Sequence, residues 1–553
     1  MKKTKAEIEQ IIQSMSPAQK AGQLFLLAYP GKDPEVIRPL VEQYGICGCY
    51  ISQDNAQTFD EAETITTKLQ TMSMEKHGIP LLLGVDQEGA WGVLLPESHP
   101  GPGNMALNAI EDIEAVASMY GIIATEMLSV GYNTVLGPCA DVNSDPSSPI
   151  IGTRSFGEYP GQVAESVSLA VMGAKKQGIL TCLKHFPGHG ATSGDTHREI
   201  PYIDKPYDAL LSSDLVPFKA GIEAGAEIVM TSHIRYPQID KDNPATLSEK
   251  ILQDILRKDL GFSGLILSDS MNMGAIRKTY DPAQSTLLAL QAGVDIVMLS
   301  EEHYDFKTGD YLSKQLRSLH LVEEAIETGI LNDSLVTDKL MRILDYKFNK
   351  MQVRTPRIPR QRFQEHAQIE LGLAKQAVSL LQTGFWPIPP EGEIVCINAT
   401  PVSSYRNMVN SRGIGPNQEI PAFNSFVHEL EAYRRIQIVS YEQVQEKEAS
   451  LKAATALIVV TEDYPLPGED FMKQEQQQLV QDLCARYLGK IVIVGLRSPY
   501  ELALYPKQVT YLCAYSSRTC SAKATAQVLL EGSLQAQQNR TPVTIRIDES
   551  EFA

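Results

Sequence analysis

The chain has 553 residues, more than one hydrophobic core can serve, since cores stop growing near ~250–300 residues, so we expect two domains. Hydrophobic residues make up 43% and charged residues 21%, which fits a globular enzyme and excludes a disordered or fibrous chain. The net charge of -18 would repel phosphate backbones and anionic lipid surfaces, so neither nucleic acid nor a membrane is an expected partner.

The first residues lack the pattern of a targeting signal. They read MKKTKAEIEQ, and Glu7 and Glu9 interrupt any apolar run of the ~7–15 residues that a signal peptide needs. Nowhere does the sequence reach the ~18 consecutive apolar residues of a membrane span. We therefore expect a cytoplasmic protein.

Eight short apolar runs recur between residues 20 and 300, and segments with helical periodicity separate them. Runs this short, alternating with segments such as DIEAVASMYGIIATEMLSVG, indicate βα units and a parallel sheet buried on both faces. Eight units in roughly 300 residues favour a TIM-type (β/α)8 barrel over a doubly wound open sheet. The runs occupy 23–29, 48–52, 80–86, 134–141, 180–185, 227–233, 265–269 and 294–300.

Polar residues stand at the carboxyl ends of most of these runs. In a parallel barrel the active site lies at that end of the strands, so these residues are the candidates for chemistry. An aspartate after a strand can instead cap the next helix, but several polar residues on one rim indicate a site. The candidates are Asp86, Asp141, Lys184 with His185, His233 and Asp269.

The chain beyond residue 347 predicts a second, smaller domain. The segment NKMQVRTPRIPRQRFQEH mixes proline with arginine and has no clear period, which is typical of a linker. Five further apolar runs alternate with helical stretches and indicate an open-sheet α/β (αβα sandwich) domain. We expect the catalytic barrel at 1–347, a linker with a connecting helix at 348–390, and the sandwich at 391–553. The five runs occupy 393–399, 435–441, 455–462, 490–496 and 509–515.

The segment KHFPGHGATSGDTHREIP, residues 184–201, carries much reactive chemistry on a loop. A metal site is one interpretation, but His185 and His189 would share a face only in a helix, and Pro187 with Gly188 oppose a helix there. The eight cysteines show no paired C-x-x-C spacing and lie mostly in apolar runs, so we expect buried free thiols. No metal and no other cofactor is expected.

Two catalytic interpretations of the same loop remain. Lys184, at the end of an apolar run, could form a Schiff base or could hydrogen-bond a substrate hydroxyl. Asp195, two residues before His197, could accept a hydrogen bond from one ring nitrogen and leave the other to transfer protons. A solvated surface loop is the alternative to such a dyad.

Asp269 supplies a partner for a proton-transferring histidine. In glycoside hydrolysis one residue protonates the leaving oxygen while a carboxylate traps the oxocarbenium-like sugar as a covalent intermediate. Sugar hydroxyls call for charged, forked hydrogen-bonding groups, and the rim offers several. The candidates for sugar binding are Asp86, Arg154, Lys184 and His185.

Five motifs together resemble glycoside hydrolase family three, in its β-N-acetylglucosaminidase branch. They are GVDQEG at 84–89, IGTRSFG at 151–157, KHFPGHG followed by DTH, PATLS at 244–248 and LSDSMNMGAI at 267–276. The resemblance begins near MSPAQKAGQLF at residue 15, covers the barrel and continues in GLRSPYEL and TPVTI of the second domain. It implies that Asp269 is the catalytic nucleophile and that His197, paired with Asp195 on a flexible loop, is the general acid/base. It also implies that the terminal nonreducing sugar is held by Asp86, Arg154, Lys184 and His185.

The stretch after GVDQEG departs from the family pattern. The family commonly continues with glycine and then arginines, one of which contacts the terminal sugar, whereas this chain reads AWGVLL. Ala90, Trp91 and Leu94 therefore replace the usual residues, and Trp91 either stacks on a sugar face or fills space.

The resulting prediction is an exo-acting, retaining β-N-acetylglucosaminidase that acts on cell-wall fragments or chitin-type oligosaccharides. One alternative is a phosphorylase on the same scaffold, since a histidine acid/base repels incoming phosphate less than a glutamate would. A noncatalytic sugar-binding protein is the other. The expected partner is a carbohydrate with terminal N-acetylglucosamine, and the sequence does not indicate the oligomeric state.

Overall fold

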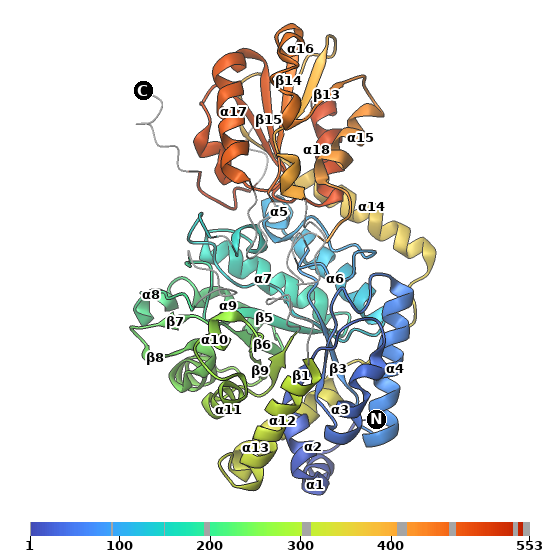
Figure 1. The fold of residues 1–553 in the computed structure, drawn as a ribbon, viewed down its shortest axis with the longest axis vertical. Helices are drawn as coiled ribbons and strands as arrows, with labels where there is room; N and C mark the ends of the chain where they lie inside the picture. The colour runs from blue at the N-terminus through green and yellow to red at the C-terminus, as the bar shows by residue number, and fades with distance from the viewer. Residues whose placement is uncertain are drawn as a thin grey trace.

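The computed structural model describes residues 2–89, 92–148, 150–192, 200–300, 311–405, 417–463, 472–532, 534 and 540–545. They form two lobes, with the first half of the chain in the lower lobe of Figure 1 and the last third in the upper one. Helix α14 (Arg360–Ala377) runs at the junction between them. The expected two-domain organisation is therefore seen in the arrangement of the chain.

The lower lobe is built on an eight-stranded parallel sheet in the order β10-β1-β2-β3-β4-β5-β6-β9. A parallel bridge between Leu267 and Ile296 joins the two ends of this order, so the sheet closes into a barrel. Each of the eight predicted runs coincides with one of these strands to within a residue or lies around it, which confirms the barrel prediction. The strands are β1 (Phe25–Leu27), β2 (Gly48–Tyr50), β3 (Leu82–Val85), β4 (Thr134–Val135), β5 (Leu180–Phe186), β6 (Ile228–Thr231), β9 (Leu265–Leu267) and β10 (Val297–Leu299).

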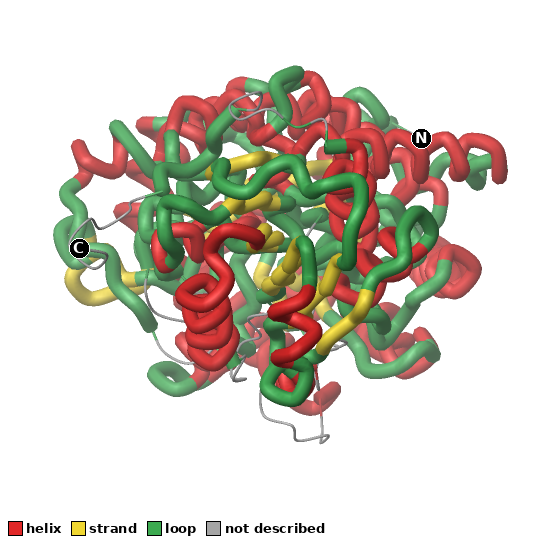
Figure 2. The backbone as a smooth tube through the Cα atoms, turned by 90° about the horizontal axis from the view of Figure 1, so that it is seen from above, coloured by secondary structure: helices red, strands yellow, loops and turns green. Residues whose placement is uncertain are grey.

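The barrel strands are buried along their whole length, as expected for strands covered by helices on one face and by barrel side chains on the other. Figure 2, seen from above, shows most strands of the molecule near the middle of the view, with helices around them. The helices that follow the eight strands are α3 (Arg38–Tyr44), α4 (Phe59–His77), α6 (Glu114–Ser129), α7 (Pro160–Lys175), α9 (Leu215–Glu223), the π-helix η4 (Lys250–Asp259), α11 (Pro282–Ala292) and α12 (Tyr311–Glu327).

Local sequence signals set the ends of these helices. Helix α4 begins with a capping box, in which the Thr58 side chain accepts from the Glu61 amide and the Glu61 side chain accepts from the Thr58 amide. It ends at Gly78, whose φ of 65° lies in the left-handed region that glycine adopts without a Cβ penalty. Two helices precede the first barrel strand, α1 (Lys5–Ser14) and α2 (Pro17–Gly22). One more helix, α13 (Asp333–Asp345), follows α12.

The insertion between β6 and η4 contains an antiparallel hairpin that the apolar pattern does not indicate. Strand β7 (Arg235–Tyr236) pairs with β8 (Asp240–Pro244). Both strands are short, and DKDNP is too polar to predict a strand from alternation.

The upper lobe holds a six-stranded sheet in the order β11-β16-β15-β14-β12-β13. All five predicted runs form strands, and their parallel pairing confirms an open α/β sheet. The sixth strand, β11 (Ser379–Gln382), lies in the segment predicted as linker and pairs antiparallel with β16. The other strands are β12 (Ile394–Asn398), β13 (Gln437–Val439), β14 (Ala456–Thr461), β15 (Ile491–Gly495) and β16 (Thr510–Cys513), with helices α15 (Ala422–Glu431), α16 (Glu448–Ala453), α17 (Lys473–Tyr487) and α18 (Thr519–Glu531).

The upper lobe contacts the barrel through direct hydrogen bonds. Arg497 Nε donates to Thr153 Oγ1 at 3.1 Å, and Asn417 Nδ2 donates to the Val93 carbonyl at 2.8 Å. Both acceptors lie on loops at the carboxyl ends of barrel strands. The second domain therefore supports the loops that form this face of the barrel.

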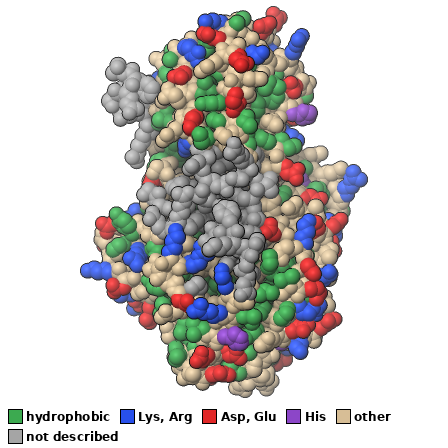
Figure 3. All heavy atoms as spheres, viewed as in Figure 1, with side chains coloured by type: hydrophobic (Ala, Val, Ile, Leu, Met, Phe, Trp, Pro, Cys, Tyr) green, Lys and Arg blue, Asp and Glu red, His purple; other side chains and the backbone are tan. Residues whose placement is uncertain are grey.

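The visible surface carries charges of both signs. On the face drawn in Figure 3, acidic and basic side chains alternate over both lobes. Among the described helices, none is long and apolar enough to cross a bilayer.

Candidate active site

The predicted site residues that the structure describes lie at one end of the barrel. Asp86 follows β3, and Asp269 follows β9. Lys184 and His185 lie near the carboxyl end of β5. Because all eight strands are parallel, their carboxyl ends meet on one rim. Arg154 reaches this rim from the short helix η2 (Gly152–Arg154) in the long segment after β4.

One buried network of ion pairs contains Asp86, Lys184 and Arg154, and a further residue, Glu88, links the two cations. Lys184 Nζ lies 2.6 Å from Asp86 Oδ1 and 2.5 Å from Glu88 Oε1. Arg154 binds Glu88 with two parallel bonds, Nη2 to Oε1 and Nε to Oε2, each 2.8 Å. Tyr50 donates its hydroxyl to Asp86 Oδ2 at 2.9 Å. Glu88 is thus shared by both cations, while the Asp86 side chain is the more accessible carboxylate, 18% exposed against 3% for Glu88.

The ion pairs hold Glu88 and Lys184 in their charged forms. Burial alone would raise the pKa of Glu88, but Arg154 and Lys184 hold it well below its usual range. Burial alone would lower the pKa of Lys184, yet Asp86 and Glu88 raise it above its ordinary value. A lysine held so firmly as an ammonium is a hydrogen-bond donor and not an amine nucleophile, which disfavours the Schiff-base interpretation.

A second buried group orients the histidines of the loop. Asp141, with no exposed surface, accepts from the His185 amide at 3.1 Å, from His185 Nδ1 at 2.8 Å and from the His189 amide at 2.7 Å. Because Nδ1 of His185 donates to Asp141, Nε2 is the ring nitrogen left to meet a ligand. His189 is buried with its Nδ1 2.8 Å from Thr192 Oγ1, and burial together with the charge on His185 lowers its pKa to about 4.

Asp269 sits on a loop tied to its neighbours. The Ser270 amide donates to Asp269 Oδ1 at 2.7 Å, and the Ser270 carbonyl lies 2.8 Å from Nε2 of buried His233. The Ser270 hydroxyl bonds that of Ser300, at the end of β10, at 2.6 Å. Burial first, and then the charges of both Asp86 and Asp269, raise the pKa of the Cys182 thiol on β5, so both carboxylates lie near that strand.

Two predicted catalytic residues, Asp195 and His197, lie outside the described residues, as do Ala90 and Trp91. Leu94 is described and is buried, with its amide donating to the Asp86 carbonyl at 3.2 Å. Leu94 therefore packs under the loop that carries Asp86 and does not offer a polar group to a ligand.

Three potential metal ligands at this site lie close enough together to bind one metal ion. Cys139, Asp141 and His185 each offer one ligand atom within 4.8 Å of the others. However, Asp141 already accepts from two amides and an imidazole, and burial raises the pKa of the Cys139 thiol well above its usual value. The donors thus form a hydrogen-bonded support for His185, and we derive no metal role for them.

Glu88 is not among the residues predicted for the site. The balance of charge among the predicted residues could have indicated it. A buried pocket that holds the two cations Lys184 and Arg154 needs more negative charge than the single carboxylate of Asp86. Glu88 stands two residues after Asp86 and supplies the missing charge.

The fold and the site together define the class of protein: a (β/α)8 barrel with a charged pocket at the carboxyl ends of its strands. Residues 9–346 match the model of the glycosyl hydrolase family 3 N-terminal domain, so the chain belongs to glycosyl hydrolase family 3. The resemblance in the sequence motifs is thereby confirmed.

Named relatives agree with this assignment. The chain is similar to beta-hexosaminidase A of Pseudoalteromonas piscicida, at 31% identity over 336 residues, which are 57% of this chain and 55% of that protein. It is also similar to a beta-hexosaminidase of Hydrogenovibrio crunogenus, at 31% identity over 280 residues, 49% of this chain and 75% of that one. The chain thus spans only about half of the first relative.

Solved structures agree over nearly the whole chain. A fungal multi-domain GH3 beta-N-acetylglucosaminidase superposes with a TM-score of 0.84 at 27% identity, covering 96% of this chain and 61% of that one. A family 3 beta-N-acetylglucosaminidase from Paenibacillus sp. str. FPU-7 has the same fold, with a TM-score of 0.84 at 24% identity and coverage of 97% and 100%.

Proposed function

We propose that the chain is an exo-acting, retaining β-N-acetylglucosaminidase that removes terminal β-linked N-acetylglucosamine. The observation that carries the proposal is the charged network around Lys184 on the same barrel rim as Asp269, in a family 3 chain. The choice of N-acetylglucosamine as the sugar is based on the names of the chain's relatives, beta-hexosaminidase and beta-N-acetylglucosaminidase.

The pocket suits a sugar with several hydroxyl groups. Lys184 and Arg154 are donors only, whereas Asp86 accepts, so the site can pair both the oxygens and the hydroxyl protons of a pyranose. Their ion pairs fix these side chains before substrate arrives, which lowers the entropy lost on binding. His185 adds Nε2, oriented through Asp141.

In the proposed mechanism Asp269 attacks the anomeric carbon C1 and displaces the aglycone oxygen. His197, held by Asp195, gives that oxygen its proton, and an ester between Asp269 and C1 forms with inversion. His197 then takes a proton from a water molecule, whose oxygen attacks C1 and breaks the ester. Two inversions give net retention of the β configuration.

The natural substrates in this proposal are cell-wall fragments or chitin-type oligosaccharides imported into the cytoplasm. This part rests on the resemblance to the β-N-acetylglucosaminidase branch, and it does not specify the aglycone.

Product analysis tests the proposal. The chain is incubated with chitobiose in water, with and without inorganic phosphate, and the first product is followed by NMR. In both samples we expect the sugar from the nonreducing end to appear at early times as free β-N-acetylglucosamine, in excess over the α/β mixture released from the reducing end. Release of the sugar 1-phosphate in the phosphate sample would point to a phosphorylase, and binding without either product would point to a noncatalytic protein.

The acid role of His197 predicts a dependence on the leaving group. His197→Ala should slow chitobiose, whose leaving alcohol needs a proton, by about 10²–10⁴-fold, whereas a 2,4-dinitrophenyl glycoside should lose far less. The measurement is kcat/KM of both substrates with wild type and variant, because kcat/KM reports the step that releases the aglycone, whereas kcat also includes the water attack that His197 assists. An equal loss on both substrates would contradict the acid role.

A further inference from the structure

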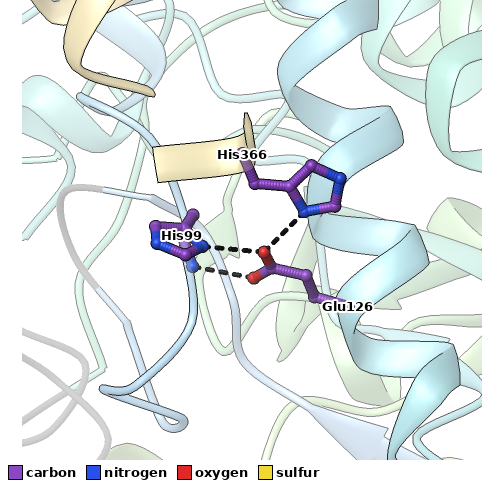
Figure 4. A group of neighbouring side chains, drawn as sticks. All are labelled: His99, Glu126 and His366. Carbon is purple, nitrogen blue, oxygen red and sulfur yellow. Dashed lines mark hydrogen bonds and ion pairs between the residues drawn. The ribbon is translucent and has the colours of Figure 1, made fainter. Parts of the chain in front are cut away.

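Outside the barrel pocket, three side chains converge on one point between the lobes. Nδ1 of His99 and Nδ1 of His366 both lie 2.8 Å from the same oxygen, Oε1 of Glu126. Figure 4 shows both imidazoles directed at this carboxylate. The three ligand atoms all lie within 4.8 Å of one another. We name this set the His–Glu–His triad.

The triad draws on three separate parts of the chain. His99 lies on the loop between β3 and α5 (Asn104–Ala109), Glu126 on α6 and His366 on α14. Folding alone therefore brings them together, and no short sequence motif predicts the cluster. Sequence spacing gave no reason to expect a metal here.

The rings and the carboxylate are fixed in position. The His99 ring packs edge-on against Phe363, with centroids 4.4 Å apart, and Phe363 is one turn before His366 on α14. The other oxygen of Glu126, Oε2, accepts from the His99 amide at 2.8 Å. Such backbone bonds hold a ligand carboxylate in one orientation.

We propose that the His–Glu–His triad is a binding site for a divalent transition metal ion, with Zn²⁺ as the preferred one. Two imidazole nitrogens and one carboxylate oxygen are a donor set suited to zinc. In a tetrahedral site with bonds of about 2.0–2.1 Å, the donor atoms stand about 3.3 Å apart, so the two 2.8 Å contacts must open slightly and the two Nδ1 atoms, within 4.8 Å of each other, must reach a similar spacing. The ion takes the place of the two Nδ1 protons, and each neutral ring then carries its proton on Nε2.

The charges around the triad favour a cation. The Glu126 side chain has no exposed surface, and its two oxygens accept from the His99 amide and from both imidazoles. A second carboxylate, that of half-buried Glu370, lies nearby and accepts from the Gly101 amide at 2.9 Å. An ion at the triad would neutralise this local negative charge.

The triad borders two hollows that can admit the ion and a water ligand. His99 lines a cleft of about 640 Å³ whose walls include Gln53 of the barrel and Arg518 of the upper lobe. His366 lines another hollow of about 670 Å³ beside α6 and α7. Three protein ligands and one water complete a four-coordinate zinc site.

The bound ion would fasten the junction between the lobes. It would cross-link α14, which leads into the upper lobe, to α6 and to the loop after β3 of the barrel. Since the ion binds the folded arrangement and not the unfolded chain, it should raise the unfolding temperature by an amount that grows with the logarithm of the free ion concentration above Kd.

Metal binding by the full chain tests the proposal without any substrate. The chelator-treated protein is titrated with Zn²⁺ against a chromophoric competitor, and Co²⁺ is added in a parallel experiment. We expect about one Zn²⁺ per chain, visible d–d absorption with Co²⁺, and a higher unfolding temperature with zinc.

Three variants locate the ion. In His99→Gln and in His366→Gln the amide can still donate to Glu126 but cannot replace an imidazole, so affinity should fall by at least about 100-fold. His428→Gln, at an exposed histidine of the upper lobe, should bind zinc like the wild type. Wild-type protein that takes up no stoichiometric zinc would overturn the proposal whatever the variants do, and so would His99→Gln and His366→Gln proteins that bind it unchanged.

Discussion

Replacing Asp269 with alanine is expected to lower turnover of an aryl β-N-acetylglucosaminide by about 10³-fold or more, because the covalent intermediate can no longer form. The loop that carries Asp269 should keep its course, since its bonds run through Ser270 to His233 and Ser300 and not through the lost carboxylate alone. Binding of N-acetylglucosamine should therefore persist while kcat collapses, and steady-state kinetics with a binding titration separate the two.

Azide gives a sharper version of this experiment. A small anion can occupy the space left in Asp269→Ala and attack C1 from the face that the carboxylate used, giving an α-glycosyl azide. The matched control is Asp254→Ala, at an exposed position on η4, which should behave like wild type. Full activity of the Asp269 variant would end the nucleophile assignment, and a β-azide would mean attack from the opposite face.

The apolar runs predict the fold because each barrel strand is buried on both faces and so stands out as a short hydrophobic segment. Strands without that burial carry no such signal: β8 reads DKDNP and pairs only within its hairpin, and β13 is partly exposed at the edge of its sheet. Strand β11 was missed for another reason. It follows α14 after one residue, and it pairs with β16 (Ser379 with Cys513, Leu380 with Leu512), a distant segment that local sequence does not reveal.

The candidate site likewise has features that the sequence predicts and features that it does not. The position of Asp86, Lys184 and His185 on the rim could be predicted, because each ends an apolar run and strand ends meet on one rim of a parallel barrel. The pairing of Arg154 with Glu88, 66 residues away, could not, and neither could the triad of His99, Glu126 and His366, which spans three elements. Long-range charge pairing is a property of the packed chain and leaves no spacing in the sequence.

Glu88→Gln is expected to cost about 3–5 kcal/mol of the barrel's free energy of unfolding, because it leaves two buried cations with too little negative charge. Lys184 keeps Asp86 at 2.6 Å, but Arg154 keeps at most one bond of its forked pair, because glutamine has a single acceptor oxygen. Arg154 and Lys184 are then held less firmly, so kcat/KM should fall as well. Denaturant unfolding and kinetics measure the two effects. A change below about 1 kcal/mol would mean that the pair contributes no more than an exposed one.

The pH dependence of this loss follows from the lowered pKa of Glu88. A carboxyl whose pKa is depressed in the folded state contributes stability above its unfolded pKa, near 4.5, and that contribution disappears as the pH falls toward the folded pKa. The difference in stability between wild type and Glu88→Gln should therefore stay constant from pH 5 to 8 and shrink below about pH 4.5. Glu448→Gln, which breaks an exposed pair with Lys452, is the matched control and should show no resolvable difference over that range. A gap that widened toward acid would show that Glu88 is protonated in the folded protein, and the charged network around Lys184 would have to be redrawn.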